Sequence, residues 1–376
     1  MSKISVKPVT TKKDLMEFIK LPFYIYKDDP NWVPPLIIER KNHFSEKNPF
    51  FKHAKVQFFL AVKDDKPVGR ISAHIDYLYI EHHKHKCGFF GFIEGIDDNE
   101  VFKQLLNAAE NWLKNEGMQE IMGPFSFSTN DEVGLLIHGF DIPPTFMLSH
   151  NKPYYIKHLE ALGYTKKKDL NCYMIDIAKE MPPFMRKTIE KTEKNIVIKS
   201  INKKDLKSES QLIGDIFNDS WTNNWGFIPF TKEEIYNFGK YLKYFIEDDF
   251  ANIAYYKGEP AGVIAVLPNL NELIKDLNGK LFPTGVFKIF RRLRKRKYTI
   301  LRAVLLGVRR KYHNNISASG IVFHMIKKIQ EVCLAKGLKH IDVSWVLEDN
   351  KGIIDLVTIG GGELYKVYRI YGKSLN

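Results

Sequence analysis

The feature that most constrains this chain is an order of predicted elements that occurs twice along it. Each copy consists of a β-hairpin, a strand, an amphipathic helix ending at glycine, and another strand. The first copy lies at 56–75, 87–96, 99–117 and 119–125, and the second at 250–269, 299–308, 319–337 and 339–350. Strands alternating with helices predict an α/β fold in which helices pack on a mixed sheet. We therefore expect two related domains, the second a degenerate repeat of the first in element order and not in residue identity.

The length of the chain fits this division. A chain of 376 residues exceeds one ordinary hydrophobic core, and its 44% hydrophobic content allows two. We expect an N-terminal domain at 1–180, a polar, proline-marked connector at 181–210 and a C-terminal domain at 211–376. The second domain carries an inserted segment at 270–298.

Cysteine usage and hydropathy bear on the compartment. Cys87, Cys172 and Cys333 are far apart and form no CxxC pair, so neither a disulfide framework nor a thiolate zinc site is expected. The N-terminus has no apolar signal region, and the sequence contains no run of 18 apolar residues. These features predict a cytoplasmic protein without a membrane span.

The charge balance points to anionic partners. A net charge of +13 attracts phosphates of nucleic acid, of coenzyme A or of lipid headgroups, and the sequence carries no recognisable nucleic-acid-binding motif. Residues 288–297 supply seven cations and no acid, next to the apolar side chains of 281–290. The segment 281–297 suits an anionic membrane surface at the inner face of the membrane, or a solvated basic helix, and both interpretations stay open.

Several segments resemble a known family. The hairpins AVKDDKPVGRISAH and IAYYKGEPAGVIAV resemble the second and third strands of GNAT N-acyltransferases, and VLLGVRRKYHNNISASGIVFHMI resembles their pyrophosphate-binding segment. Nearly the whole chain resembles bacterial tandem-GNAT proteins, including ceramide synthase-like N-acyltransferases, through FYIYKDDPNWVPPL, GPFSFSTNDEVGLLIHGF, MLSHNKPYYIKHLEALGY, NDSWTNNWGFIPFT and SWVLEDN. The resemblance implies an acyl-CoA-dependent N-acyltransferase whose acceptor is an amine, and for the ceramide synthase-like members a long-chain amine.

The resemblance also implies where the donor binds. Backbone N–H groups at a helix N-terminus bind anions, and nearby cations strengthen such a site. The candidate acyl-CoA residues are Val308, Arg309, Arg310, Lys311, Ser319, Gly320 and Asn350. The usual glycine motif is not intact there, so a solvated basic turn is the alternative. In the first domain the corresponding stretch, IEGIDDNEVF, is acidic and predicts no coenzyme A.

Amide formation from a thioester requires a base for the amine and an acid for the departing thiolate. The candidates for these roles are Asp131, Glu132, His150, Tyr365 and Tyr368. Each has a structural alternative: a helix cap for Asp131 and Glu132, a loop contact for His150, and the core for the tyrosines. Candidates for substrate binding are Asn130, Tyr154, Trp221, Asn224 and Trp225.

Two further groups have an ordinary explanation. The run that contains His82, His83 and His85 is interleaved with lysines, so we expect a solvated loop and no metal. Cys333 lies within a predicted helix and is expected in the core and not as a nucleophile.

Two other functions remain compatible with the sequence. The imperfect glycine motif also fits a catalytically degenerate GNAT-fold binding protein. The basic surface also fits a transferase that uses aminoacyl-tRNA, which would bind tRNA with a steep dependence on salt.

Overall fold

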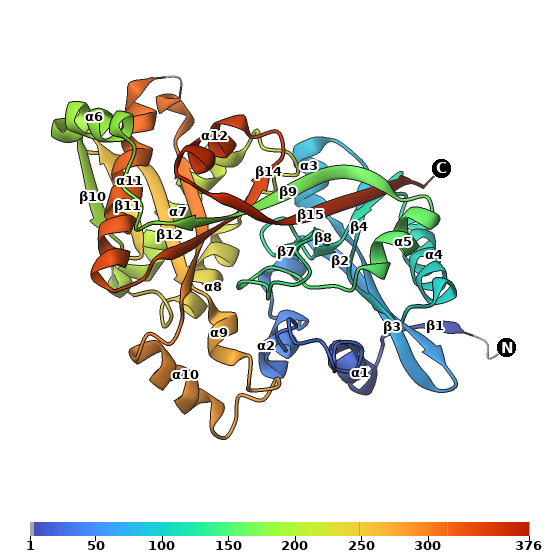
Figure 1. The fold of residues 1–376 in the computed structure, drawn as a ribbon. Coiled ribbons are helices and arrows are strands. Elements are labelled where there is room, and N and C mark those ends of the chain that lie inside the picture. The colour runs from blue at the N-terminus through green and yellow to red at the C-terminus, as the bar shows by residue number, and fades with distance from the viewer. Residues whose placement is uncertain (1–3, 248, 314, 376) are drawn as a thin grey trace. The chain divides into compact units, whose positions relative to one another are not determined.

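Both predicted hairpins form as antiparallel strand pairs in the computed structural model, which describes residues 4–247, 249–313 and 315–375 (Figure 1). The chain divides into two compact units. The first consists of Met1–Leu170, Ile274–Ile289 and Lys366–Asn376, and the second of Asn171–Leu273 and Phe290–Tyr365.

The first unit begins with a capped helix. Thr11 and Asp14 form a reciprocal capping box at the start of α1 (Lys12–Ile25), which continues through Pro22. The remaining elements that lie within this unit are α2 (Ile37–His43), η1 (Pro49–Lys52), β1 (Ser5–Pro8), β2 (Ala54–Lys63), β3 (Lys66–Asp76), α3 (Tyr77–His83), β4 (Cys87–Gly95), α4 (Asn99–Asn115), β5 (Glu120–Gly123), β6 (Phe125–Ser126), β7 (Glu132–Val133), β8 (Leu135–His138) and α5 (Tyr154–Ala161).

The elements of the second unit follow the same plan. They are α6 (Pro183–Thr192), η2 (Glu193–Asn195), β10 (Ile196–Ser200), η3 (Lys203–Asp205), α7 (Leu206–Trp221), α8 (Lys232–Leu242), β11 (Ala251–Tyr256), β12 (Glu259–Pro268), β13 (Ile300–Val308), η4 (Arg310–Tyr312), α11 (Ile316–Ala335), β14 (His340–Leu347) and α12 (Lys351–Ile359). Four elements contain or adjoin residues of both units: β9 (Thr165–Asp176), α9 (Leu270–Ile274), α10 (Gly285–Arg294) and β15 (Glu363–Ser374). The polar stretch 181–210 thus forms a helix, a strand and the start of another helix.

Strand order repeats between the units. In the first, the order is β1-β2-β3-β4-β5-β15, and in the second it is β10-β11-β12-β13-β14. Neighbours are antiparallel in both, except for the pairs β4·β5 and β13·β14, which are parallel. The helices α4 and α11 make the crossovers that parallel pairing requires. The predicted α/β fold with mixed sheets and flanking helices is confirmed.

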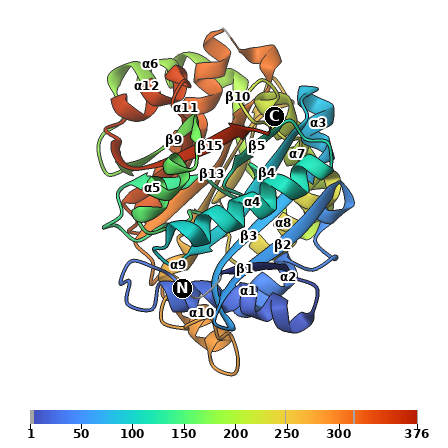
Figure 2. The same ribbon diagram turned by 90° about the vertical axis from the view of Figure 1, so that its right-hand side faces the viewer.

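Helices cover both faces of each sheet. In the first unit Gly69 lies against Val101 and Leu105 of α4, whereas the next residue, Arg70, contacts Phe18 of α1. Figure 2 shows α4 lying across the strands of this unit. In the second unit Gly262 lies against α11, and the neighbouring Val263 packs with Ile216 of α7. Since successive strand residues point to opposite faces, these contacts place the helices on opposite sides of each sheet.

In the part of the chain that the structure describes, no helix combines the length and the apolar character needed to cross a membrane.

Candidate functional site

The two central strands of the second unit separate partway along their length. The parallel ladder joins Ile300–Ala303 of β13 to His340–Val343 of β14. Beyond it, β13 continues to Val308 and β14 to Leu347 with no further ladder pair among the described residues of these strands. We call the segments 304–308 and 344–347 the second-unit fork. Its peptide groups lack strand partners on one side, so an extended ligand can hydrogen-bond there.

The N-terminus of α11 lies on the chain shortly after the strand that forms one side of this fork. Asn315 caps the helix by accepting from the Ser317 N–H at 2.6 Å, and the first turn contains no acid. The helix runs for 20 residues, so its N-terminal dipole favours an anion. Tyr312 is buried, and His313 Nε2 lies 2.9 Å from the carbonyl oxygen of Val308. These contacts fold the preceding loop back on β13.

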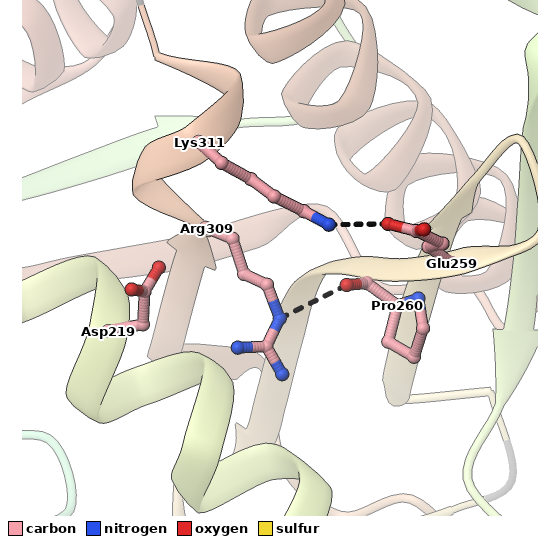
Figure 3. Close-up of a pocket in the computed structure, with 5 residues that line it drawn as sticks. All are labelled: Asp219, Glu259, Pro260, Arg309 and Lys311. Carbon is pink, nitrogen blue, oxygen red and sulfur yellow. Dashed lines mark hydrogen bonds and ion pairs between the residues drawn. The ribbon is translucent and has the colours of Figure 1, made fainter.

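A pocket of about 330 Å³ lies beside this loop and is lined by Asp219, Glu259, Pro260, Arg309 and Lys311 (Figure 3). Arg309 Nε donates to the Pro260 carbonyl at 3.1 Å, which holds the guanidinium along the pocket wall. Lys311 Nζ pairs with the Glu259 carboxylate, and this hydrogen bond lowers the pKa of Glu259. The lining therefore combines two cations with two carboxylates.

The neighbouring Arg310 is also engaged. Its backbone N–H donates to Asp219 Oδ2 at 2.8 Å, and its side chain lies 3.5 Å from the same carboxylate. A phosphate that used these cations would compete with Asp219 and Glu259. The cations of the loop thus lie beside carboxylates from other elements. The run of cations in the sequence did not reveal these carboxylates.

The other candidate donor residues differ in exposure. Val308 and Gly320 are buried, and Gly320 packs so closely on Thr192 of α6 that a Cβ there would contact the threonine side chain. Ser319 is exposed on α11. Asn350 accepts from the Ile353 N–H at 3.3 Å and caps α12. Close helix packing accounts for the glycine, and capping accounts for the asparagine.

Trp221 lies against the fork strand. Its Nε1 donates to the Leu306 carbonyl at 3.3 Å, beyond the last ladder pair, and its ring stacks on Phe217 at 4.9 Å. Asn224 donates its backbone N–H to the Trp221 carbonyl, which forms the turn after α7. Trp225 is half-buried in this turn.

The two candidate tyrosines occupy β15. Tyr368 is fully buried, and its hydroxyl donates to the Ser149 carbonyl at 2.8 Å. Tyr365 is half-buried and lies three residues earlier, so the two side chains point to opposite faces of the strand. They cannot serve one face of the sheet together.

The first unit closes the corresponding separation with its own backbone. Its parallel ladder joins Cys87–Phe89 to Glu120–Met122, after which β4 continues to Gly95. The Phe125 carbonyl lies so near Gly91 that a Cβ would overlap it, and Gly123 meets the Phe90 carbonyl in the same way. We call the segments 90–95 and 123–125 the first-unit fork. Backbone fills the place that an extended ligand would need.

The helix after this fork begins with acids. Asp98 caps α4 by accepting from the Glu100 N–H at 3.0 Å, and Glu100 lies in the first turn. Asp97 Oδ1 lies 2.8 Å from His158 Nε2, and Lys63 approaches Asp98 at 3.3 Å. The carboxylates already satisfy the positive end of the helix, so it offers little to a phosphate.

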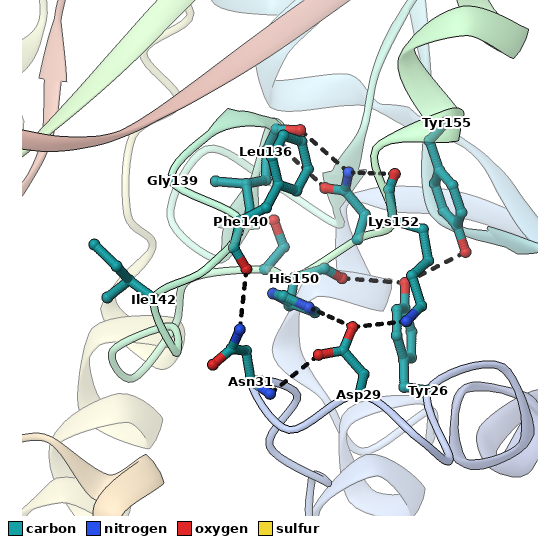
Figure 4. Close-up of polar contacts among 12 residues, drawn as sticks. Tyr26, Asp29, Asn31, Leu136, Gly139, Phe140, Ile142, His150, Lys152 and Tyr155 are labelled. Carbon is teal, nitrogen blue, oxygen red and sulfur yellow. Dashed lines mark hydrogen bonds and ion pairs between the residues drawn. The ribbon is translucent and has the colours of Figure 1, made fainter.

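A buried polar network surrounds His150 in the first unit (Figure 4). His150 Nε2 lies 3.1 Å from Asp29 Oδ2, and Lys152 Nζ donates to the same oxygen at 2.8 Å. Burial raises the pKa of Asp29, but the bonds from Lys152 and His150 outweigh it and lower the pKa to about 2. Burial lowers the pKa of His150, whose Nδ1 is buried without a hydrogen-bond partner. The imidazole is therefore neutral at pH 7.

This network continues to a buried carboxyl. The Tyr26 hydroxyl donates to Glu94 at 2.5 Å and the Tyr155 hydroxyl at 2.7 Å, while Arg70 approaches the same carboxyl at 3.6 Å. Burial raises the pKa of Glu94. The hydroxyl of Tyr154 donates to the Gly95 carbonyl at 2.8 Å, so this substrate candidate is bonded to β4.

The acidic candidates lie in a turn and not at a helix start. Asn130 and Asp131 donate their backbone N–H groups to Ser128, and Glu132 begins β7, which pairs with β6. No helix follows within the described residues 131–150, so the cap alternative does not apply. Glu132 Oε1 accepts from Arg40 at 3.1 Å. Glu132 and His150 thus contact different partners.

His43 is a residue that the sequence did not single out. Its ring stacks on Phe127 at 4.8 Å, and its Nε2 is buried without a hydrogen-bond partner. Burial, with Arg40 nearby, lowers the pKa of His43 to about 3. Asp29 and Glu94 were also missed. FYIYKDDPNWVPPL contains Asp29 and pointed to this region only as a whole segment.

One group of potential metal ligands occurs in the first unit. The ligand atoms of His85, Cys87 and Glu120 all lie within 4.8 Å of one another. Burial raises the pKa of the Cys87 thiol, and Lys167 pairs with Glu120. The carboxylate is already ion-paired, and we base no metal site on these three residues.

Comparisons with known proteins identify relatives of the whole chain. No protein-family model matches the chain. Over 371 residues it is 41% identical to protein YghO of Escherichia coli, covering 98% of this chain and 95% of the relative. Over 375 residues it is 38% identical to a bacterial ceramide synthase of Caulobacter vibrioides, covering 99% and 98%.

Solved structures show the same fold at low identity. A tandem GNAT protein from the clavulanic acid biosynthesis pathway aligns with a TM-score of 0.58 and 9% identity, covering 100% of this chain and 99% of that one. A GCN5-related N-acetyltransferase from Sphaerobacter thermophilus aligns with a TM-score of 0.53 and 11% identity, covering 99% and 96%. These likenesses concern the fold alone.

Proposed function

For this chain, an acyltransferase that belongs to the tandem-GNAT family of YghO and the Caulobacter bacterial ceramide synthase, we propose that an acyl-CoA is the donor and an amine the acceptor. The second unit binds the donor, and the acceptor is a long-chain, sphingoid-type amine. The name of the Caulobacter relative, a ceramide synthase, supports the acceptor class.

The second-unit fork is the observation that carries the donor assignment. A pantetheine arm is an extended chain with amide groups, and the fork offers it strand edges that are not paired with each other. The acid-free N-terminus of α11 follows the loop after β13, where the pyrophosphate would receive backbone N–H groups. Arg309 and Lys311 beside it supply positive charge once Glu259 is displaced.

The reaction transfers the acyl group directly. The neutral amine attacks the thioester carbonyl, the tetrahedral oxyanion collapses, and the C–S bond breaks as the thiolate takes a proton. We assign Tyr365 as the acid, because the Tyr368 hydroxyl is committed to the Ser149 carbonyl. Among the candidates of the first unit, burial lowers the pKa of His150 and Glu132 is ion-paired to Arg40, and we assign neither a role in the reaction.

Ligand-induced stabilisation tests the donor assignment. A short-chain acyl-CoA should raise the melting temperature of the wild type, and an Arg309→Glu/Arg310→Glu variant should lose this shift. A Lys187→Glu/Lys191→Glu variant reverses two charges on α6 of the same unit and should keep it. An unchanged shift in the Arg309/Arg310 variant would remove the loop from the donor site.

Thiol release tests the activity. With acyl-CoA and a panel of amines, the wild type should release free coenzyme A fastest with a long-chain amine. Lipids extracted from that reaction should contain a new long-chain amide. Tyr365→Phe should lower kcat with little change in KM, because it removes a proton donor and no binding group. Release with short polar amines only would reject the sphingoid-type acceptor.

A second candidate is a catalytically degenerate binding protein. It is favoured by the pairing of Lys311 with Glu259 and of Arg310 with Asp219, which neutralises the loop. Such a protein would show the acyl-CoA-induced shift in melting temperature and would release no thiol with any amine.

A further inference from the structure

Helix α10 exposes an apolar face where a helix of a folded protein would normally be polar. Phe282 just before the helix, and Phe287 and Phe290 on it, are 65%, 77% and 58% exposed. Phe287 and Phe290 are three residues apart and therefore lie on one face of the helix. Three large aromatic side chains exposed within residues 282–290 form an apolar patch that its own chain leaves uncovered.

The opposite face of α10 is anchored to the protein. Gly285 and Ile289 are buried, and Arg292 donates to the Leu273 carbonyl at 2.6 Å. Because these contacts fix the inner face, rotation of the helix cannot bury the phenylalanines. Figure 1 shows α10 beside α9, with the chain looping between them.

Unpaired cations surround the apolar patch. Arg291, Arg294, Lys295 and Lys297 are exposed, and none has an ion-pair partner among the described residues. The other cations of this stretch are engaged: Lys288 lies 3.5 Å from Asp276, and Arg296 binds Glu247. The free charges thus lie next to the phenylalanines or just beyond the helix C-terminus, and no acid occurs between 277 and 300 to offset them.

We propose that α10 docks on an anionic lipid bilayer, with Phe282, Phe287 and Phe290 in the headgroup boundary and the four free cations on anionic headgroups. An amphipathic helix with aromatic residues on one face and basic residues beside them binds a membrane interface in this way. Each cation near such a surface is worth about a fivefold gain in partitioning, which is about 1 kcal/mol.

A nucleic acid fits the patch less well. Its phosphates would bind the cations, but it offers no apolar interior in which the exposed phenylalanines could be buried. The lipid surface accounts for both the charge and the aromatic exposure. This inference does not depend on the proposed acyl transfer, because the surface would bind vesicles whether or not the chain is catalytically active.

Co-sedimentation with vesicles tests the proposal. The full chain should bind phosphatidylglycerol-containing vesicles, bind vesicles of phosphatidylcholine alone far more weakly, and detach as salt rises. Phe287→Ser/Phe290→Ser should weaken binding on the order of tenfold or more, since two apolar side chains lose their burial. Arg291→Glu/Arg294→Glu should weaken binding by a similar factor on anionic vesicles and leave the weak binding to neutral vesicles unchanged.

The control is Phe184→Ser on α6. Phe184 is 46% exposed and lies outside the α10 patch and its cations. It should bind like the wild type, and all variants should melt near the wild-type temperature because the changed side chains are exposed. Wild-type protein that fails to bind anionic vesicles would overturn the proposal. So would tighter binding to RNA than to vesicles that survives Phe287→Ser/Phe290→Ser.

Discussion

The two units share one strand order but differ at the point where their two central parallel strands separate. In the first unit the Phe125 carbonyl and Gly91 are in such close contact that backbone fills the first-unit fork. In the second, β13 and β14 leave their ladder after Ala303 and Val343, and the two sides of the second-unit fork are no longer paired with each other. The same topology therefore gives a closed element in one unit and a place for an extended ligand in the other.

The helices that follow these forks differ in the same sense. Helix α4 starts with Asp98 as its cap and Glu100 in its first turn, whereas α11 starts with the neutral Asn315. A helix start that carries its own carboxylates repels an anion, and an uncharged start attracts one. The two units thus share an architecture while a few side chains make one helix start acidic and leave the other neutral.

The largest expected effect comes from forcing the first-unit fork apart. Gly91→Ala places a Cβ on the Phe125 carbonyl, which is backbone and cannot rotate away, so the free energy of unfolding should fall by about 3 kcal/mol or more. Gly95→Ala on the same strand is the control. Its Cβ would lie 3.1 Å from the Phe102 ring, and it should cost less than about 1.5 kcal/mol in urea unfolding. Equal costs would contradict the closed fork.

Acid should destabilise the first unit through its buried histidines. Burial lowers the pKa of His43 to about 3 and of His74 to about 4, below the ordinary value near 6.5, so the unfolded chain binds protons first. Stability is therefore full above pH 6.5 and is lost as the pH falls toward 3. Each histidine contributes a slope of up to about 1.4 kcal/mol per pH unit. His43→Asn should make the free energy of unfolding, measured with urea at pH 6.5, 5.5 and 4.5, depend less steeply on pH. An unchanged slope would show that His43 is solvated.

A single acidic residue should make the N-terminus of α11 resemble that of α4. Asn315→Asp keeps a side-chain oxygen for the Ser317 N–H, so stability should change by less than about 0.5 kcal/mol. The new charge should weaken acyl-CoA binding about fivefold, since a charge at a helix N-terminus is worth about 1 kcal/mol. Isothermal titration calorimetry measures this effect, and unchanged affinity would place the phosphates elsewhere.

The smallest effect is expected from the reverse change. Asp98→Asn removes a carboxylate from α4 but leaves the first-unit fork filled, so no acyl-CoA site should appear there. The loss of the exposed Lys63 pair should cost less than about 1 kcal/mol. A second binding event in calorimetry would show that charge alone, and not the closed backbone, excludes the donor.

The sequence predicted the fold well because local sequence patterns determine most of its elements. Hairpins, the amphipathic helices α4 and α11 and the glycines after them follow from turn chemistry and periodicity. The sequence also showed that α4 starts with acids and that α11 does not. The end of α1 could not be predicted, because the helix continues through Pro22, a residue that usually ends one.

The candidate site was predicted only in part. Partners distant in sequence, such as Glu259 for Lys311 and Asp29 for His150, bring charges together through the fold, and no spacing encodes them. Gly320 stays a candidate donor residue, and its close packing on Thr192 of α6 is a further contact that only the fold brings together. Burial of His43 likewise depends on its stacking on Phe127 from a distant turn.

Hydrogen–deuterium exchange with and without a short-chain acyl-CoA tests the central difference most directly, because it reports both forks in one protein. The ligand should slow exchange in peptides covering 304–313, 315–320 and 344–350, and leave those covering 90–102 and 119–127 unchanged. Slowed exchange at 90–102 with none at 304–320 would place the donor in the first unit and contradict the account.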